Sequence, residues 1–265
     1  MVLMMKKIFK LNIVLMFLCI GNQSYAFDQE VIYSTYDNKQ ISYASLIDDL
    51  SRADIVLIGE KHDEESHHEA EYNLLNDTKL VRKSGSVLLE TFTPSQQKRI
   101  NAVQQWFASG KTISDKSLPS KLDWNKWDWN QYHSLIKLLL SEKAAVIAAN
   151  PNSTDVKNSG SFVPESKLAS QELVRQSLGE IMGVDKNHAL VGKQQFKDYY
   201  MAKTLIDAPK PAWLIAGAIH TSKDLGVPLH LDDIHKSKMK VIILTTVGTE
   251  IEKTHADYIW YLPTK

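Results

Sequence analysis

The chain has 265 residues, with 31 lysines and arginines against 31 aspartates and glutamates. Removing residues 1–26, a predicted leader, takes away three lysines and no acid, which leaves 28 basic and 31 acidic residues and a net charge of −3. A weakly acidic chain lacks the positive surface that attracts nucleic acids and anionic membranes, so nucleic acid is excluded as a partner class.

The amino terminus has the three parts of a secretory signal peptide. Three lysines precede a short apolar run, and Ser24-Tyr25-Ala26 has the small residues of a cleavage site. The run is shorter than the roughly 20 residues of a membrane-spanning helix. We therefore predict residues 1–26 to be a Sec signal peptide that directs the protein to the periplasm or cell envelope.

The only cysteine, Cys19, lies within this leader. The mature chain is then expected to contain no disulfide, cysteine–zinc site or catalytic thiol. A lipid anchor on Cys19 is the less favoured alternative, because Met16-Phe17-Leu18 lacks the small residues that lipoprotein processing prefers.

Short apolar runs alternate with helical patterns along residues 27–265. The runs are nearly continuous, which is typical of strands covered on both faces of a sheet. Between them, apolar residues recur every three or four positions, as in helices. The alternation predicts an α/β domain whose mostly parallel central sheet is flanked by helices. The predicted strands are 54–59, 86–90, 144–149, 212–217, 240–245 and 259–262.

Two blocks are helical with no strand pattern between their helices. They cover residues 96–135 and 162–207. We predict that they form a smaller helical subdomain packed beside the sheet. Residues 124–133 concentrate three tryptophans, which we interpret as core of this subdomain, with an aromatic wall for a flat ligand as the alternative.

Polar side chains follow the predicted strands. Ligands of parallel sheets bind outside the carboxyl ends of the strands, where loops and helix amino termini converge. One such histidine is more often structural than a ligand, but the repetition favours a shared site. The residues at these ends are Glu60 and His62 in a Gly-x-x-His unit, Glu90, Asn150, and His220 in a second Gly-x-x-His unit.

A helix carrying Gln194, Asp198, Met201 and Leu205 presents all four on one face. A buried glutamine and aspartate need hydrogen-bonding partners. We expect the strand-end histidines to supply them, which places Gln194 and Asp198 in the same polar pocket.

At these residues the sequence resembles the ChaN family of bacterial haem-binding, iron-regulated envelope proteins, within the wider Tiki/EreA-like superfamily. The matching pieces run in the expected order from about residue 53 to residue 231, which is most of the predicted mature chain. Each motif is weak alone, but the ordered set is specific. It favours His68 over His67 as a site residue. The matching pieces are residues 55–63 with His68, residues 88–90, Trp124, Trp127 and Tyr132, Asn150-Pro151, His188 to Ala202, residues 216–220 and Gly226-Val227-Pro228.

The resemblance implies an α/β core with a smaller helical subdomain, and haem binding that serves iron uptake. Ferric iron favours phenolate oxygen or imidazole nitrogen among the ligands available here. Candidate haem ligands are Tyr199 and Tyr200, then Tyr132 with His133, and His188 would neighbour them or meet a propionate. Expected partners are haem, a haem-uptake system of the envelope, and a second copy of the chain.

The alternative function is hydrolytic. Glu60 would act as general base on water, with Glu90 beside it, while His62 and His220 bind a divalent metal or stabilise developing charge. A metal-independent hydrolase remains open on the same residues. We favour a binding protein over an enzyme.

Overall fold

A mostly parallel, eight-stranded sheet forms the centre of the computed structural model, which describes residues 24–25, 29–80 and 85–264. The strand order is β3-β2-β10-β8-β4-β7-β5-β6, and the predicted α/β fold class is confirmed. From β10 to β6 all neighbouring strands are parallel, whereas β2 pairs antiparallel with β10 and with β3. The bounds are β2 Val31–Ser34, β3 Lys39–Ile41, β4 Ile55–Glu60, β5 Ser86–Leu89, β6 Ala145–Ala148, β7 Ala212–Gly217, β8 Met239–Thr246 and β10 Tyr258–Leu262.

All six predicted strands are present within one residue at each end, whereas β2 and β3 were not predicted. A separate antiparallel pair joins β1 (Ser24–Tyr25) to β9 (Ile251–Glu252). The rest of the predicted leader, including Cys19, lies outside the described residues. Within the described part of the chain, no helix is long and apolar enough to cross a membrane.

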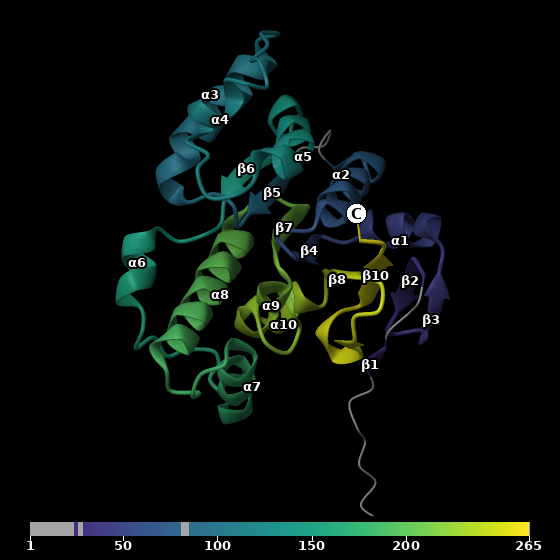
Figure 1. The fold of residues 1–265 in the computed structure, drawn as a ribbon, viewed down its shortest axis with the longest axis vertical. Coiled ribbons are helices and arrows are strands. Elements are labelled where there is room, and N and C mark those ends of the chain that lie inside the picture. The colour runs from purple at the N-terminus through teal and green to yellow at the C-terminus, as the bar shows by residue number, and fades with distance from the viewer. Residues whose placement is uncertain (1–23, 26–28, 81–84, 265) are drawn as a thin grey trace, which may run out of the picture.

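Helices cover both faces of the sheet (Figure 1). Several begin at a residue whose side chain accepts a hydrogen bond from the first turn, such as Ser42 before α1 and Asp128 before α5. The bounds are α1 Tyr43–Leu50, α2 Glu65–Asp77, α3 Gln97–Ala108, α4 Leu118–Leu122, α5 Trp129–Ser141, α6 Ser153–Asn158, α7 Glu172–Met182, α8 Ala189–Asp207, α9 Ala218–Thr221 and α10 Asp233–Lys236, with 3₁₀ helices η2 Pro94–Gln96, η3 Val227–His230 and η4 Lys253–His255.

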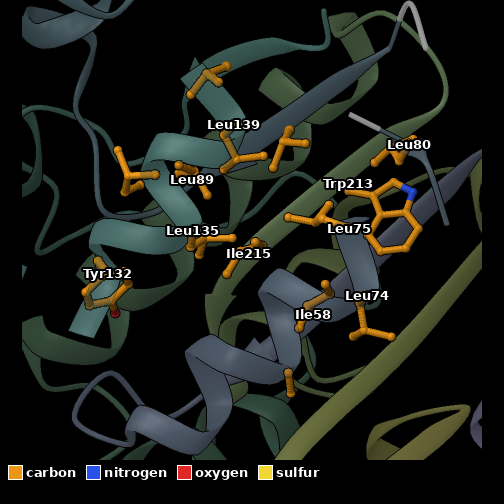
Figure 2. Close-up of a cluster of buried hydrophobic side chains, with 14 of the residues drawn as sticks. Ile58, Leu74, Leu75, Leu80, Leu89, Tyr132, Leu135, Leu139, Trp213 and Ile215 are labelled. Carbon is orange, nitrogen blue, oxygen red and sulfur yellow. The ribbon is translucent and has the colours of Figure 1, made fainter. Parts of the chain in front are cut away.

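Alternate residues of the strands other than β3 in the central sheet belong to two separate hydrophobic cores. Val56 and Ile58 of β4 face one core, which also contains side chains of α1 to α5. Ile55 and Leu57 face the other, which contains Met201 and other residues of α8. Because side chains alternate along a strand, a continuous apolar run serves both faces. Figure 2 shows α5 and α2 side chains meeting those of β7 in the first core.

The two predicted helical blocks lie against opposite faces of the sheet. Buried residues of 96–135, on α3, α4 and α5, belong to the first core. Buried residues of 162–207, on α7 and α8, belong to the second core and to a small satellite core around Leu178 and Val191. The division of the chain into a domain and one helical subdomain stays a prediction.

Candidate functional site

Three adjacent strands end at one edge of the sheet and carry the polar residues there. β4 is flanked by β7 and β8, and β5 lies on the other side of β7. Glu60 is the last residue of β4, Glu90 follows β5, and Gly217 ends β7 just before α9 and His220. The parallel register aligns Glu60 with Gly217, so these chain ends are brought together.

Glycine at position 59 lets α9 approach β4. A Cβ there would lie 2.2 Å from Thr221 Oγ1, closer than real Cβ contacts, and 3.0 Å from the Ala218 Cα, which is unusually tight. The backbone N–H of Gly217 donates to Glu90 Oε2 at 2.9 Å. Each Gly-x-x-His unit thus holds its strand end close to its neighbours.

The predicted catalytic residues form a line of alternating carboxylates and imidazoles. His62 Nδ1 lies 2.5 Å from Glu60 Oε1, and its Nε2 lies 3.6 Å from Glu90 Oε2. His220 Nε2 lies 3.2 Å from Glu90 Oε1, and its Nδ1 lies 2.5 Å from Asp198 Oδ1. We call Glu60, His62, Glu90, His220 and Asp198 the strand-end network. The predicted proximity of residues 60, 62, 90 and 220 is therefore observed.

Residues of α8 complete this network from the second face. Gln194 Nε2 lies 2.9 Å from His220 Nδ1, and Asp198 is fully buried. Lys197, which sequence reasoning missed, places its Nζ 3.3 Å from Glu90 Oε1. Its position next to Asp198 on the same helix was the available signal. The interpretation of Gln194 and Asp198 as partners of the strand-end histidines agrees with these contacts.

A second arm leads from Glu60 into the first core. Tyr132 of α5 donates its hydroxyl to Glu60 Oε1 at 3.1 Å. The Nδ1 atom of His68, on α2, lies 4.0 Å from Glu60 Oε2 and 3.1 Å from Glu71 Oε2. Glu71 is fully buried and was not predicted as a site residue, although its i, i+3 spacing from His68 puts both on one helix face.

Neighbouring opposite charges set the protonation states of His220 and Glu90 in the strand-end network. Burial opposes a charge on His220, but Glu90 and Asp198 outweigh it and raise the pKa of His220 to about 10. Burial would raise the pKa of Glu90, but His220, Lys197 and His62 hold that pKa far below its usual range. At neutral pH we therefore assign His220 as an imidazolium that holds Glu90 as a carboxylate.

Glu60 raises the pKa of both His62 and Tyr132. Burial opposes protonation of His62, yet its hydrogen bond and charge contact with Glu60 raise its pKa above the ordinary value. Burial, followed by the charge of Glu60, raises the pKa of the Tyr132 phenol, which stays protonated.

The network opens onto a cleft of about 520 Å³ above β4, β7 and the end of β8. The His62 side chain, 29% exposed, is the most accessible member of the network. An imidazole held by a carboxylate at the floor of a cleft can accept or deliver a proton to a bound molecule. The cleft is lined by Glu60, Lys61, His62, Asp63, His67, Gln194, residues 217–220, residues 243–246, Thr249 and Ile251.

The predicted metal pair of His62 and His220 does not share a ready cation site. Both ring nitrogens of His220 already contact Asp198 or Glu90. Among the described residues, two groups of three potential ligands have their ligand atoms within 4.8 Å of one another, and neither contains this pair. They are the buried group Glu60, His68 and Glu71, and the half-buried group Asp224, Glu252 and His255.

His67 and His68 separate into two roles. The His67 Nδ1 accepts a hydrogen bond from the Lys61 backbone at 3.0 Å, which secures the turn before α2. Burial lowers the pKa of His67 to about 4, so this ring is neutral. His68 instead joins Glu60 and Glu71.

The five predicted haem-binding residues do not lie in one place. Tyr132 is 1% exposed inside the first core, whereas His133 and His188 are exposed, and His188 accepts from Leu190 N as the cap of α8. Tyr199 and Tyr200 are half-buried and line a separate hollow of about 430 Å³. The assignment of these residues as haem ligands stays a prediction, and Tyr199 with Tyr200 is the pair of them that lines one hollow.

The tryptophan segment lies between core and solvent. Trp124 and Trp127 are partly buried and pack on the first core, and the Trp127 ring lies 4.2 Å from that of His62. Together with Asn150, they line a hollow of about 390 Å³. Both interpretations of this segment thus have structural counterparts.

Comparisons with known proteins give a family and a fold. The family model "Haem-binding uptake, Tiki superfamily, ChaN" matches residues 46–231. A solved structure described as cofacial heme binding to ChaN of Campylobacter jejuni is similar over 88% of this chain and 96% of that chain, with 26% identity and a TM-score of 0.78.

Two other solved structures are more distant. The type III effector HopBA1 is 10% identical over 89% of this chain and 97% of that chain, with a TM-score of 0.46. A Bacillus cereus protein is 13% identical over 80% of this chain and 69% of that chain, with a TM-score of 0.42. No curated protein matches the sequence.

Proposed function

We propose that this chain is an exported protein that binds haem for haem or iron acquisition. The chain belongs to the ChaN family of haem-binding uptake proteins in the Tiki superfamily. The family match over residues 46–231 is the observation that carries the proposal. The similarity to the Campylobacter jejuni protein, described as binding haem cofacially, supports it.

Among the predicted haem ligands, Tyr199 and Tyr200 lie in the hollow that suits haem best. It is lined by Ile147, Ala208 and Pro209, which suit a flat apolar ring, and by Lys203, which suits a propionate. Tyr132 is unsuited because its hydroxyl is buried against Glu60. A phenolate from Tyr199 or Tyr200 would bind ferric iron as a hard oxygen ligand.

A tyrosine must lose its phenol proton before its oxygen can bind ferric iron as a phenolate. Burial, followed by the nearby charge of Asp155, raises the pKa of Tyr200 above its ordinary value. A bound ferric ion compensates by stabilising the phenolate directly. A haem that keeps an open face also permits a second chain to cover it, so we include a homodimer in the proposal.

Hemin titration of the protein recovered from the periplasmic fraction of cells expressing the full chain tests this proposal. We expect recovery in that fraction, and a Soret band that is shifted from free hemin and saturates at a defined ratio. Tyr199→Phe with Tyr200→Phe should weaken binding by roughly tenfold or more, equivalent to at least about 1.4 kcal/mol. Tyr36→Phe, at an exposed tyrosine, is the matched control. A hemin spectrum unchanged from that in buffer would contradict haem binding.

A second candidate function is hydrolysis in the 520 Å³ cleft, favoured by the His62–Glu60 pair at its floor. Since His220 is fully engaged by Asp198 and Glu90, His62 is the better proton acceptor, without a metal on His220. If the protein hydrolyses a model ester, His62→Gln should reduce kcat/KM by about 100-fold or more. His133→Gln, an exposed imidazole on α5, should leave the rate unchanged. Equal rates for wild type and His62→Gln would remove this candidate.

A further inference from the structure

Glu60, His68 and Glu71 form a compact donor group behind the strand-end network. His68 and Glu71 lie one turn apart on α2 and face the end of β4, where Glu60 is located. One donor atom from each residue lies within 4.8 Å of the other two. Two carboxylates and one imidazole are suited to divalent transition metals, and the two negative charges would neutralise such an ion.

Two carboxylate oxygens in this group lack a partner. Glu60 Oε2 and Glu71 Oε1 are buried without any hydrogen bond among the described residues. The two side chains are 1% and 0% exposed. A buried carboxylate without a partner is costly, and such groups are normally paired, protonated or bound to a metal. His68 is the imidazole that contacts Glu71, and it also faces Glu60 Oε2.

The remaining polar atoms of Glu60 and His68 are engaged by other parts of the chain. Glu60 Oε1 already accepts a hydrogen bond from Tyr132 and contacts His62 Nδ1. This leaves Glu60 Oε2 on the side of His68 and Glu71. His68 Nε2 lies 3.3 Å from the backbone carbonyl of His62 and donates to it, which leaves Nδ1 directed at the carboxylates. A ring nitrogen bonded to a carbonyl while the other faces acidic ligands is the usual arrangement of a metal-binding histidine.

We propose that Glu60, His68 and Glu71 bind a divalent transition metal of the Zn²⁺ or Mn²⁺ class. The site is distinct from the Tyr199 and Tyr200 hollow and does not rest on haem binding.

Metal titration of the chelator-treated full chain with Zn²⁺ or Mn²⁺ alone tests the site. We expect one equivalent to remain after gel filtration, measured by elemental analysis, together with a rise in Tm. Glu71→Gln keeps the side-chain shape and should weaken metal binding by at least about 100-fold. Mutating a residue that only hydrogen-bonds to a metal ligand already costs up to about that much, so loss of a ligand should cost at least as much.

The variants also separate binding from folding. Without metal, Glu71→Gln should have a Tm equal to or above that of the wild type, because a buried amide carries no charge whose burial would be costly. With metal, only the wild type should gain Tm. His255→Gln, in the half-buried Asp224 group, is the matched control and should bind as the wild type does. Absence of metal in the wild type, equal binding by Glu71→Gln, or loss of binding only in His255→Gln would overturn the site.

Discussion

Replacing Asp198 by alanine is expected to lower the free energy of unfolding by about 3–5 kcal/mol, the typical loss when one partner of a buried ion pair is removed. Asp198 is fully buried, and its Oδ1 lies 2.5 Å from His220 Nδ1. Its removal leaves the buried His220 imidazolium with one carboxylate fewer. The resulting space on α8 adds a cavity beside Met201 and the second core.

Urea unfolding followed by circular dichroism measures this loss. Asp207→Ala, an exposed aspartate at the end of the same helix, is the matched control and should change stability by at most about 0.5 kcal/mol. Asp198→Asn should fall between the two, because the amide oxygen still accepts from His220. If Asp198→Ala is no less stable than Asp207→Ala, the pair does not stabilise the fold.

The pH dependence of stability provides the second large effect. The folded protein raises the pKa of His220 to about 10, whereas an unfolded histidine titrates near about 6.5. The stability that this proton provides is therefore fully present below about pH 6.5 and is lost as pH rises toward about 10. Glu90 has the opposite sign: its lowered pKa gives stability above about pH 4.3 that is lost in acid.

The difference between wild type and His220→Gln isolates this contribution from other groups that titrate at high pH. We expect the wild type to lose stability more steeply between about pH 6.5 and 10, by a few kcal/mol in total. His133→Gln, an exposed histidine, should follow the wild-type profile. Parallel profiles for wild type and His220→Gln would show that His220 is not held as an imidazolium.

The polar edge of the sheet was predictable because parallel strands impose it. Once the apolar runs were assigned as parallel strands, Glu60, Glu90 and His220 had to emerge at the same edge. Strand β2 was missed because it pairs antiparallel, outside the parallel strand–helix alternation on which the assignment rested. Strand β3 was missed because it has only three residues, of which two are exposed. Runs of that length carry little periodic signal.

Sequence by itself determined the α/β class, the six parallel strands and the meeting of the two Gly-x-x-His units, because each depends on local periodicity and on a fixed strand direction. Tertiary structure alone decided which helix faces meet these strand ends. Tyr132 reaches Glu60 across 72 positions, and His188 caps α8 rather than facing a ligand. Glu71 meets Glu60 only because α2 packs against β4. Contacts between distant segments depend on how whole helices pack, which local residue spacing does not encode.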